Sequence, residues 1–238
     1  MNLIDIHSHI LPDVDDGART VEESIELLKS LKAQGVTDVI ATPHFIANEQ
    51  NLDEFFQIVK EASEELFAAT QNLDLPNVYL GSEVYYFAGI GKSKAISTLC
   101  LNKTKYLLLE LPTCTIDKYI LDDIKRIRTE LGLIPIIAHI ERYAKEKGFK
   151  HVLSLIDGGV CLAQLNATSL FMPQYKKISY KLIKKGYISF IATDTHSLRH
   201  RPPMLDSAFD AIETNLGKNY SALLLENSDY LQKEITNA

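Results

Sequence analysis

The feature of this sequence that most constrains its fold is a repeated alternation between a short apolar run and a longer amphipathic segment. The runs are nearly continuous in Val, Ile, Leu and Ala, as expected for strands buried on both faces of a parallel sheet. Parallel neighbours require a crossover, so the alternation predicts right-handed βαβ units and one parallel sheet. The seven predicted strands span residues 3–6, 38–41, 78–80, 106–111, 134–138, 160–165 and 188–192.

Helices are predicted between these runs from capping residues and from apolar spacing. Thr20 and Glu23 fit a capping box, which satisfies free backbone N–H groups at the start of a helix, and Asn51 and Glu54 fit a second. Apolar residues at helical spacing predict a third helix over residues 120–131. Further helices are expected over residues 149–157, 175–185 and 204–216.

The chain is expected to fold as a single domain. Its 238 residues are 46% hydrophobic and 24% charged, and they contain no linker, low-complexity stretch or repeat of solenoid length. We therefore expect one α/β domain over residues 1–238. The strand pattern alone permits either a closed seven-stranded barrel or an open doubly wound sheet, and the ligand pattern described below favours the barrel.

Charge, hydropathy and cysteine content exclude several classes of protein. The net charge of −6 excludes a broad nucleic-acid-binding face. No apolar run approaches the ~20 residues that cross a bilayer, and the N-terminus lacks the features of a signal peptide. The three cysteines form no CxxC pair and suit a reducing compartment. The sequence therefore predicts a cytoplasmic protein that is not embedded in a membrane.

Polar side chains follow nearly every predicted strand. Five of the seven histidines lie at such positions, whereas His151 and His200 do not. In parallel α/β folds the carboxyl ends of the strands converge on one mouth, so we expect these side chains to share a pocket. The histidines are His7, His9, His44, His139 and His196, and the carboxylates are the pair Asp15-Asp16 together with Glu83, Glu110 and Asp194.

Each of these motifs alone has a plain structural explanation, such as a solvated strand end, a turn or a helix N-cap. Together, five imidazoles and at least four carboxylates would crowd one pocket, and clustered carboxylates repel one another unless protons or cations neutralise them. Nitrogen and oxygen ligands without cysteine suit Mn, Fe, Zn or Mg, and nine ligands are too many for one ion. The sequence therefore predicts a multinuclear metal site.

Two arginines, Arg142 and Arg201, come just after the fifth and seventh predicted strands. A guanidinium fork matches phosphate oxygens, and the same strand ends would direct both side chains toward the metals. For either residue alone a surface salt bridge is an equal alternative. Arg199 and His200 add local positive charge, and His200 is a speculative proton donor.

These motifs resemble the polymerase-and-histidinol-phosphatase (PHP) superfamily over residues 3–203. Arg201-Pro202-Pro203 is similar to one branch, the bacterial manganese-dependent protein tyrosine phosphatases of capsule and exopolysaccharide clusters (CpsB/YwqE-like). The matching motifs are HSHILP at 7–12, DDG at 15–17, ATPH at 41–44, GSE at 81–83, LELP at 109–112, AHIER at 138–142 and TDTH at 193–196.

The resemblance implies a distorted (β/α)7 TIM-like barrel that holds three divalent metal ions, with manganese as the leading candidate and Fe, Zn or Mg as alternatives. It also implies that Arg142 and Arg201 grip the phosphate. The implied ligands are His7, His9, Glu83 and Asp194 for the first ion, Glu83, Glu110 and His139 for the second, and Asp16, His44 and His196 for the third.

The activity implied is hydrolysis of phosphotyrosine on a protein, with the tyrosine-rich tail of a bacterial tyrosine autokinase in polysaccharide export as the expected partner. A histidinol-phosphate or other small-molecule phosphatase with the same trinuclear site is the main alternative. An amidohydrolase would bridge its metals with a lysine at a strand end, where this chain has Glu110 instead, and a non-enzymatic assembly module would lack ligands. A cysteine-based phosphatase is excluded, because no Cys-x5-Arg motif is present.

Overall fold

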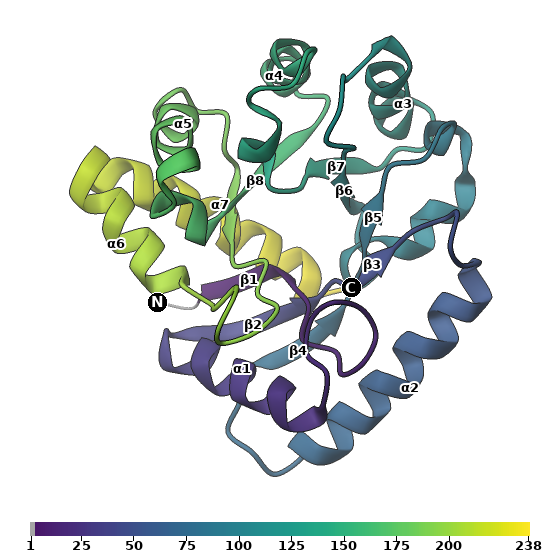
Figure 1. Ribbon diagram of the computed structural model, residues 1–238, viewed down its shortest axis with the longest axis vertical. Helices are drawn as coiled ribbons and strands as arrows, with labels where there is room; N and C mark the ends of the chain where they lie inside the picture. Colours follow the sequence, from purple (N-terminus) through teal and green to yellow (C-terminus); the bar gives the residue numbers. More distant parts are fainter. Residues whose placement is uncertain (1–2) are drawn as a thin grey trace.

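The computed structural model describes residues 3–238, in which parallel strands form an inner layer and helices surround them (Figure 1). The seven predicted runs all contain strands, which confirms the α/β class. Two short strands, at residues 44–45 and 83–85, were not predicted. The strands are β1 (Leu3–Ser8), β2 (Val36–Ala41), β3 (His44–Phe45), β4 (Asn77–Leu80), β5 (Glu83–Tyr85), β6 (Tyr106–Glu110), β7 (Ile134–Ile137), β8 (Leu162–Asn166) and β9 (Phe190–Ala192).

The strands pair in two sheets that together trace a distorted barrel. One sheet has the order β1-β2-β4 and the other the order β3-β5-β6-β7-β8-β9. Since β2 leads into β3 and β4 leads into β5 after two residues each, these pairs occupy the second and third of seven strand positions. The edges β1 and β9 meet through a parallel bridge between Ser8 and Thr195, and Asp194 N donates to His7 O at 2.8 Å. The predicted distorted barrel is confirmed.

The interruptions in the second and third strands occur at Pro43 and Gly81. Pro43 cannot donate a backbone hydrogen bond. A Cβ atom at Gly81 would lie 2.8 Å from the end of the Leu101 side chain, so a larger residue there would require Leu101 to shift. Hydrogen bonds from Gly81 N to Ala41 O and from Glu83 N to Pro43 O nevertheless carry the pairing across the break.

The helices form where capping and apolar spacing predict them, and the predicted ranges differ from the observed ones by at most two residues at either end. Asn51 and Glu54 complete the expected capping box: Glu54 N donates to Asn51 Oδ1 at 3.0 Å and Asn51 N to Glu54 Oε2 at 3.2 Å. The spacing argument did not predict the last helix. The helices are α1 (Val21–Ala33), α2 (Leu52–Thr70), α3 (Lys118–Thr129), α4 (Phe149–Asp157), α5 (Pro173–Lys184), α6 (Leu205–Leu216) and α7 (Lys218–Thr236).

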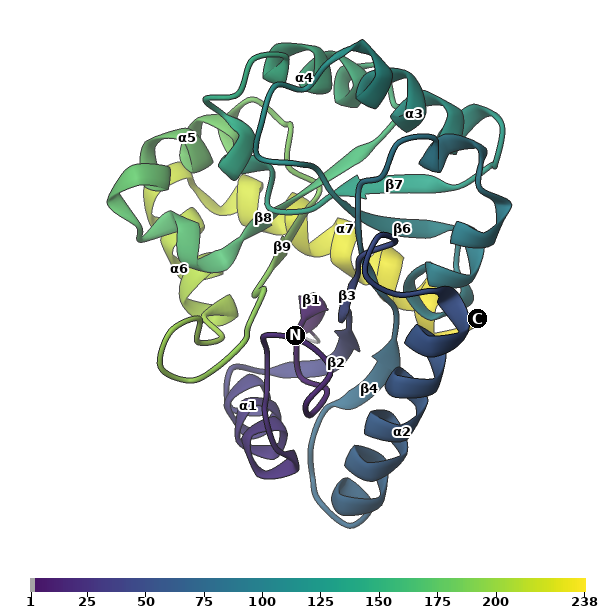
Figure 2. The same cartoon turned by 45° about the vertical axis from the view of Figure 1, so that its right-hand side comes forward.

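Helix α7 closes one end of the barrel. Its Leu231 and Ile235 side chains are fully buried and pack with Ile4, Ile6 and Leu108 in an inner cluster that is separate from the larger core beneath the other helices. Figure 2 shows α7 crossing behind β8. The carboxyl ends of the strands lie at the opposite end, which is left open to carry polar side chains.

The buried Leu231 and Ile235 side chains of α7 form an apolar plug at this end of the barrel, and shortening one of them is expected to destabilise the fold. Leu231→Ala deletes a fully buried side chain, so we expect the free energy of unfolding to fall by about 2–5 kcal/mol. Leu223→Ala on the same helix, where the side chain is 53% exposed, is the control and should change it by about 0.5 kcal/mol or less. Urea unfolding followed by circular dichroism measures the free energy of unfolding of both variants. Equal decreases in the two variants would contradict the stabilising role of the buried Leu231 side chain.

Candidate metal centre

The open end of the barrel brings together all nine side chains that the sequence predicts as ligands. Eight of them form three overlapping groups in which one donor atom from each residue lies within 4.8 Å of the others. His139 joins them, since its Nε2 atom is 2.9 Å from Glu83 Oε1. The groups are His7, His9, Glu83 and Asp194; His44, Glu83 and Glu110; and His9, Asp16, His44 and His196.

The first group is the most deeply buried. The Nε2 atoms of His7 and His9 lie 3.2 Å apart and face each other. Glu83 Oε2 is 3.1 Å from His7 Nε2 and 3.3 Å from His9 Nε2. Asp194 Oδ1 completes the group at 3.4 Å and 3.5 Å from the same two atoms. Four donor atoms therefore converge on one point without solvent contact.

Glu83 also reaches a second set of donors. Its Oε1 atom contacts His139 Nε2, which lies 3.5 Å from Glu110 Oε1. Its Oε2 atom is 3.1 Å from His44 Nδ1, which lies 3.8 Å from Glu110 Oε2. A carboxylate in this position can bridge two cations, as the resemblance to the PHP superfamily implies.

The third group lies nearest the solvent. Asp16 Oδ1 is 3.0 Å from His196 Nε2 and 3.5 Å from His44 Nε2. His44 thus directs one ring nitrogen at this group and the other at Glu83 and Glu110. The sequence assigned His44 to the third ion alone, whereas in the structure its ring lies between two groups.

Hydrogen bonds from outside the cluster hold the imidazoles with one nitrogen facing inward. His7 Nδ1 donates to Gln164 Oε1 at 3.2 Å, His9 Nδ1 to Asp15 Oδ2 at 2.6 Å, and His196 Nδ1 to the Asp194 backbone oxygen at 2.9 Å. A histidine that ligates a metal characteristically donates its other ring N–H to such a partner, which fixes the tautomer and the ring orientation.

Sequence reasoning missed two of these supporting residues. Gln164 also accepts the His139 backbone N–H at 2.7 Å, so one side chain positions two ligands. Its signal in the sequence was an amide inside an otherwise apolar strand. Tyr143 OH lies 3.3 Å from His139 Nδ1, and no spacing argument could have found it. Asp15 was recognised only as half of an acidic pair, and its role is to hold His9.

Unpaired buried atoms test whether the residues fit a metal. Within residues 3–238, four buried side-chain atoms lack a hydrogen-bond partner, and three of them belong to the predicted ligands: His44 Nδ1, Glu83 Oε2 and His196 Nε2. An unpaired buried polar atom is costly and calls for a missing partner. Divalent cations among the donors would satisfy all three, so the residues fit the predicted group.

The charges of the cluster favour cations. Burial opposes ionisation of Glu83, but the neighbouring His7 imidazole and the hydrogen bond from His139 outweigh it and hold the pKa of Glu83 well below its usual range. Burial similarly opposes ionisation of Asp194, yet His7 and other neighbours keep the pKa of Asp194 well below normal. Burial and the nearby Glu83 raise the pKa of Glu110 to about 7. Glu83 and Asp194 are thus ionised and their charge must be matched locally, whereas Glu110 exchanges its proton near neutral pH.

Both predicted phosphate-binding arginines lie at the rim of this cluster. Arg142 Nη2 donates to Asp194 Oδ2 at 2.5 Å, and Arg201 Nη2 donates to Asp16 Oδ2 at 2.7 Å. Their side chains remain 27% and 36% exposed, so each guanidinium keeps a face toward solvent. His200 and Arg201 line a cavity of about 610 Å³ beside Asp16 and His196.

Two positions in the cluster have unusual backbone conformations. His139 has φ of 31° and Asp194 has φ of 51°, in the left-handed region that non-glycine residues rarely adopt. Such conformations gather at functional sites, where surrounding contacts hold them in place. Each one turns a ligand at the end of its strand toward the cluster.

Comparison with known proteins gives one family. The family model described as "Capsular polysaccharide synthesis, CpsB/CapC" matches residues 3–233. The tyrosine-protein phosphatase CpsB of Streptococcus pneumoniae is 35% identical over 94% of this chain and 96% of its own, and that of Streptococcus agalactiae is 33% identical over 97% and 98%.

Among solved structures, the chain is similar to one from a report on the crystal structures of YwqE from Bacillus subtilis and CpsB from Streptococcus pneumoniae. That report describes the two proteins as unique metal-dependent tyrosine phosphatases. The TM-score is 0.84, at 30% identity over 98% of this chain and 95% of the other.

Removing a shared ligand is expected to reduce metal binding. His9 belongs to two groups of donors, so His9→Ala should lower the Mn²⁺ content by at least one ion per chain after loading and gel filtration, as measured by elemental analysis. His151→Ala, at an exposed position on α4, is the control and should match the wild type. An unchanged Mn²⁺ content in His9→Ala would contradict the assignment.

Proposed function

Since the chain belongs to the CpsB/CapC family of capsular polysaccharide synthesis proteins, we propose that it is a metal-dependent phosphatase that hydrolyses phosphotyrosine on a protein. The observation that carries the proposal is the overlap of three groups of donor atoms with two arginines at their rim. A relative of known structure is described as a metal-dependent tyrosine phosphatase, which supports the same chemistry here.

The two arginines bind the phosphate in this proposal. A phosphate monoester is a dianion with several acceptor oxygens, and the guanidinium fork matches it with two parallel hydrogen bonds. Asp194 and Asp16 hold Arg142 and Arg201 in place, so little side-chain entropy is lost when the substrate binds. The phosphorus is thereby held over the donor cluster.

The donor cluster would hold three divalent cations, which we propose to be Mn²⁺, with Fe, Zn or Mg as alternatives. The donor set of imidazole nitrogens and carboxylate oxygens without cysteine suits these ions. When bound, such ions neutralise the charge of the phosphoryl oxygens and lower the pKa of a water molecule toward neutral pH. The proposed ligands are His7, His9, Glu83 and Asp194; Glu83, Glu110 and His139; and Asp16, His44 and His196.

A cysteine nucleophile has no place in this mechanism, because none of the three cysteines, the exposed Cys114 included, begins a Cys-x5-Arg motif. Cys100 and Cys161 are buried, and burial raises the pKa of both thiols to about 12, which suppresses the reactive thiolate. The tyrosinate leaving group has a pKa of ~10, far below that of a serine alkoxide, so it needs less assistance from a general acid. His200, on the wall of the cavity beside Arg201, is the proposed candidate for such a donor.

The substrate we propose is the tyrosine-rich tail of a bacterial tyrosine kinase in capsule or exopolysaccharide synthesis. Membership in a capsular polysaccharide family supports this choice. A kinase tail of this kind would be met in the cytoplasm, where we place the enzyme. Among the residues described, no helix has the length and apolar character needed to cross a membrane.

Removing either arginine side chain should strongly reduce the phosphatase activity while the protein still folds. With Mn²⁺ present, we expect Arg142→Ala and Arg201→Ala to lower kcat/KM on an aryl phosphate by about 10²–10³-fold, because each removes a charge that the transition state needs. Arg128→Ala, at an exposed position on α3, serves as the control and should keep wild-type activity. Turnover that persists in a metal chelator, or in Arg142→Ala, would count against the proposal.

The small-molecule alternative predicts the opposite substrate preference. We expect kcat/KM for a phosphotyrosine peptide to exceed that for histidinol phosphate by at least about tenfold, because the arginines lie at an open rim that admits a side chain carried on a polypeptide. Phosphate release from both substrates under identical Mn²⁺ conditions measures the ratio. A preference for histidinol phosphate would favour the alternative.

A further inference from the structure

Positive charge is concentrated in one segment of an otherwise acidic chain. Residues 142–187 contain nine of the 25 Lys and Arg residues but only two of the 31 Asp and Glu residues. This segment therefore carries a net charge of +7, whereas the rest of the chain carries −13. The segment includes α4 and α5, which neighbour each other on the outside of the barrel in both views (Figures 1 and 2).

Two adjoining cavities of about 440 Å³ each lie along α5, one between α5 and α4 and the other between α5 and residues 141–146, which precede α4. Ala144, Glu146, Ile178 and Lys181 line both of them, so the two cavities are continuous, and we name them together the α4–α5 groove. Six lysines line the groove: Lys145, Lys147, Lys150, Lys177, Lys181 and Lys185.

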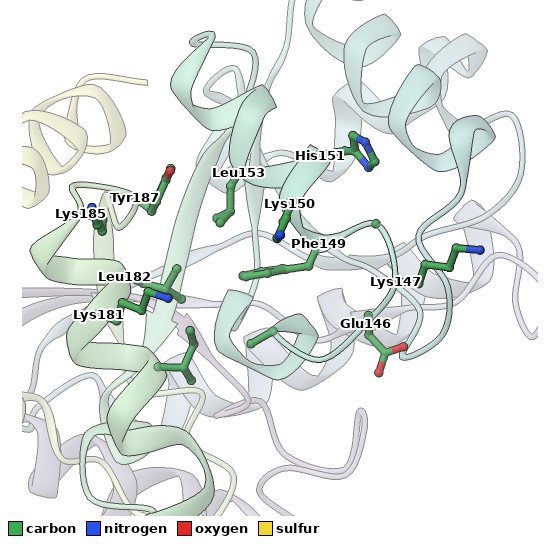
Figure 3. A pocket seen from close by; sticks show the side chains of 13 residues that line it. Glu146, Lys147, Phe149, Lys150, His151, Leu153, Lys181, Leu182, Lys185 and Tyr187 are labelled. Atoms are coloured by element: carbon green, nitrogen blue, oxygen red, sulfur yellow. The ribbon is translucent and has the colours of Figure 1, made fainter.

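The groove combines an apolar floor with charged walls. Phe149 and Leu182 are buried beneath it, while its lysines are exposed. In Figure 3 the Lys150 side chain from α4 and the Lys181 side chain from α5 extend into the space around the Phe149 ring. The aliphatic stems of lysine can pack along such a floor while the ammonium groups stay in water.

The lysines of the groove have no counter-ions within the part of the chain that the structure describes. The lysine ion pairs there involve Lys29, Lys32, Lys60, Lys125 and Lys218, and all of these lie outside the groove. The acids that line it are Glu146 and the buried Glu141. Ammonium groups gathered along α5, the start of α4 and the loop before α4 repel one another, and an anionic partner relieves that repulsion.

The groove begins at the phosphate site. Arg142, which donates to Asp194 at the rim of the metal centre, lines its inner end. A polypeptide whose phosphotyrosine is held by Arg142 therefore has neighbouring residues at the entrance of the groove. A concave channel with this origin favours an extended peptide over a membrane, whose surface is flat.

We propose that the α4–α5 groove binds acidic residues that flank the phosphotyrosine in the protein substrate. This inference rests on the proposed function, and it adds a specificity site that is separate from the reacting groups. The lysines contact carboxylates of the substrate, and the apolar floor receives the hydrocarbon parts of the same segment. Because the contacts are exposed and charged, they raise the association rate and weaken as salt increases.

The test compares two phosphotyrosine peptides that differ only in a flank of four Glu or four Gln residues, with p-nitrophenyl phosphate as a substrate without a flank. In the wild type with Mn²⁺, kcat/KM should be about tenfold higher for the acidic peptide, and the ratio should shrink at high salt. The double variant Lys150→Glu/Lys181→Glu should lose this preference while its activity on p-nitrophenyl phosphate stays within about twofold of the wild type.

The matched control is Lys105→Glu/Lys233→Glu, which makes the same charge change at two exposed positions outside the groove. It should keep the preference for the acidic peptide. Lys150→Gln/Lys181→Gln should lose part of the preference, and the melting temperatures of all variants show whether they fold.

Equal kcat/KM for the two peptides in the wild type would overturn the inference, as would a preference that survives in Lys150→Glu/Lys181→Glu. Loss of binding to vesicles of anionic lipid in that variant, with peptide preference unchanged, would also overturn it and assign the groove to a membrane. A wild type that hydrolyses neither peptide contradicts the proposed function instead. In that case, fluorescence anisotropy of the labelled acidic peptide tests the groove by binding alone, and binding equal to that of the Gln peptide would overturn it.

Discussion

The enforced proximity of buried carboxylates and imidazoles is the constraint on which the rest of this structure depends. Glu83 and Asp194 are almost completely buried, and each lies within 3.5 Å of both His7 and His9. An uncompensated buried charge costs several kcal/mol, so these groups can share one site only with matched positive charge among them. Parallel strands solve the geometric part of this problem, because their carboxyl ends meet at one mouth and deliver side chains that are far apart in sequence.

Much of the fold follows from local patterns in the sequence. The strands are continuous apolar runs, and a helix such as α2 begins at a capping box whose residues lie three apart, so local rules find both. The breaks at Pro43 and Gly81 escaped those rules. A side chain at Gly81 would crowd Leu101, twenty residues later, and this is a tertiary contact that no local pattern encodes. Helix α7 likewise depends on tertiary contacts, because its buried apolar residues pack against the barrel interior.

The candidate site likewise contains some residues that the sequence predicts and others that it does not. The grouping of the nine predicted ligand side chains was predictable because all but Asp16 lie at or just beyond the carboxyl end of a predicted strand, and strand ends converge. Their supports were not, because Gln164 meets His7 across 157 residues of sequence, and a single amide in a strand has many structural explanations. The orientation of His44 was also beyond prediction. The family motif assigned His44 to the third ion alone, whereas its two ring nitrogens contact Asp16 on one side and Glu83 on the other.

The two ends of the barrel impose opposite energetic demands. At the mouth, His139 and Asp194 hold left-handed backbone conformations, which cost free energy that the surrounding contacts must offset. At the other end, Leu231 and Ile235 bury hydrocarbon that favours folding under any condition. A ligand that binds only the folded chain adds its binding free energy to stability. The apolar contacts of α7 favour the closed barrel whether or not ions are bound, and the closed barrel presents its donor atoms together.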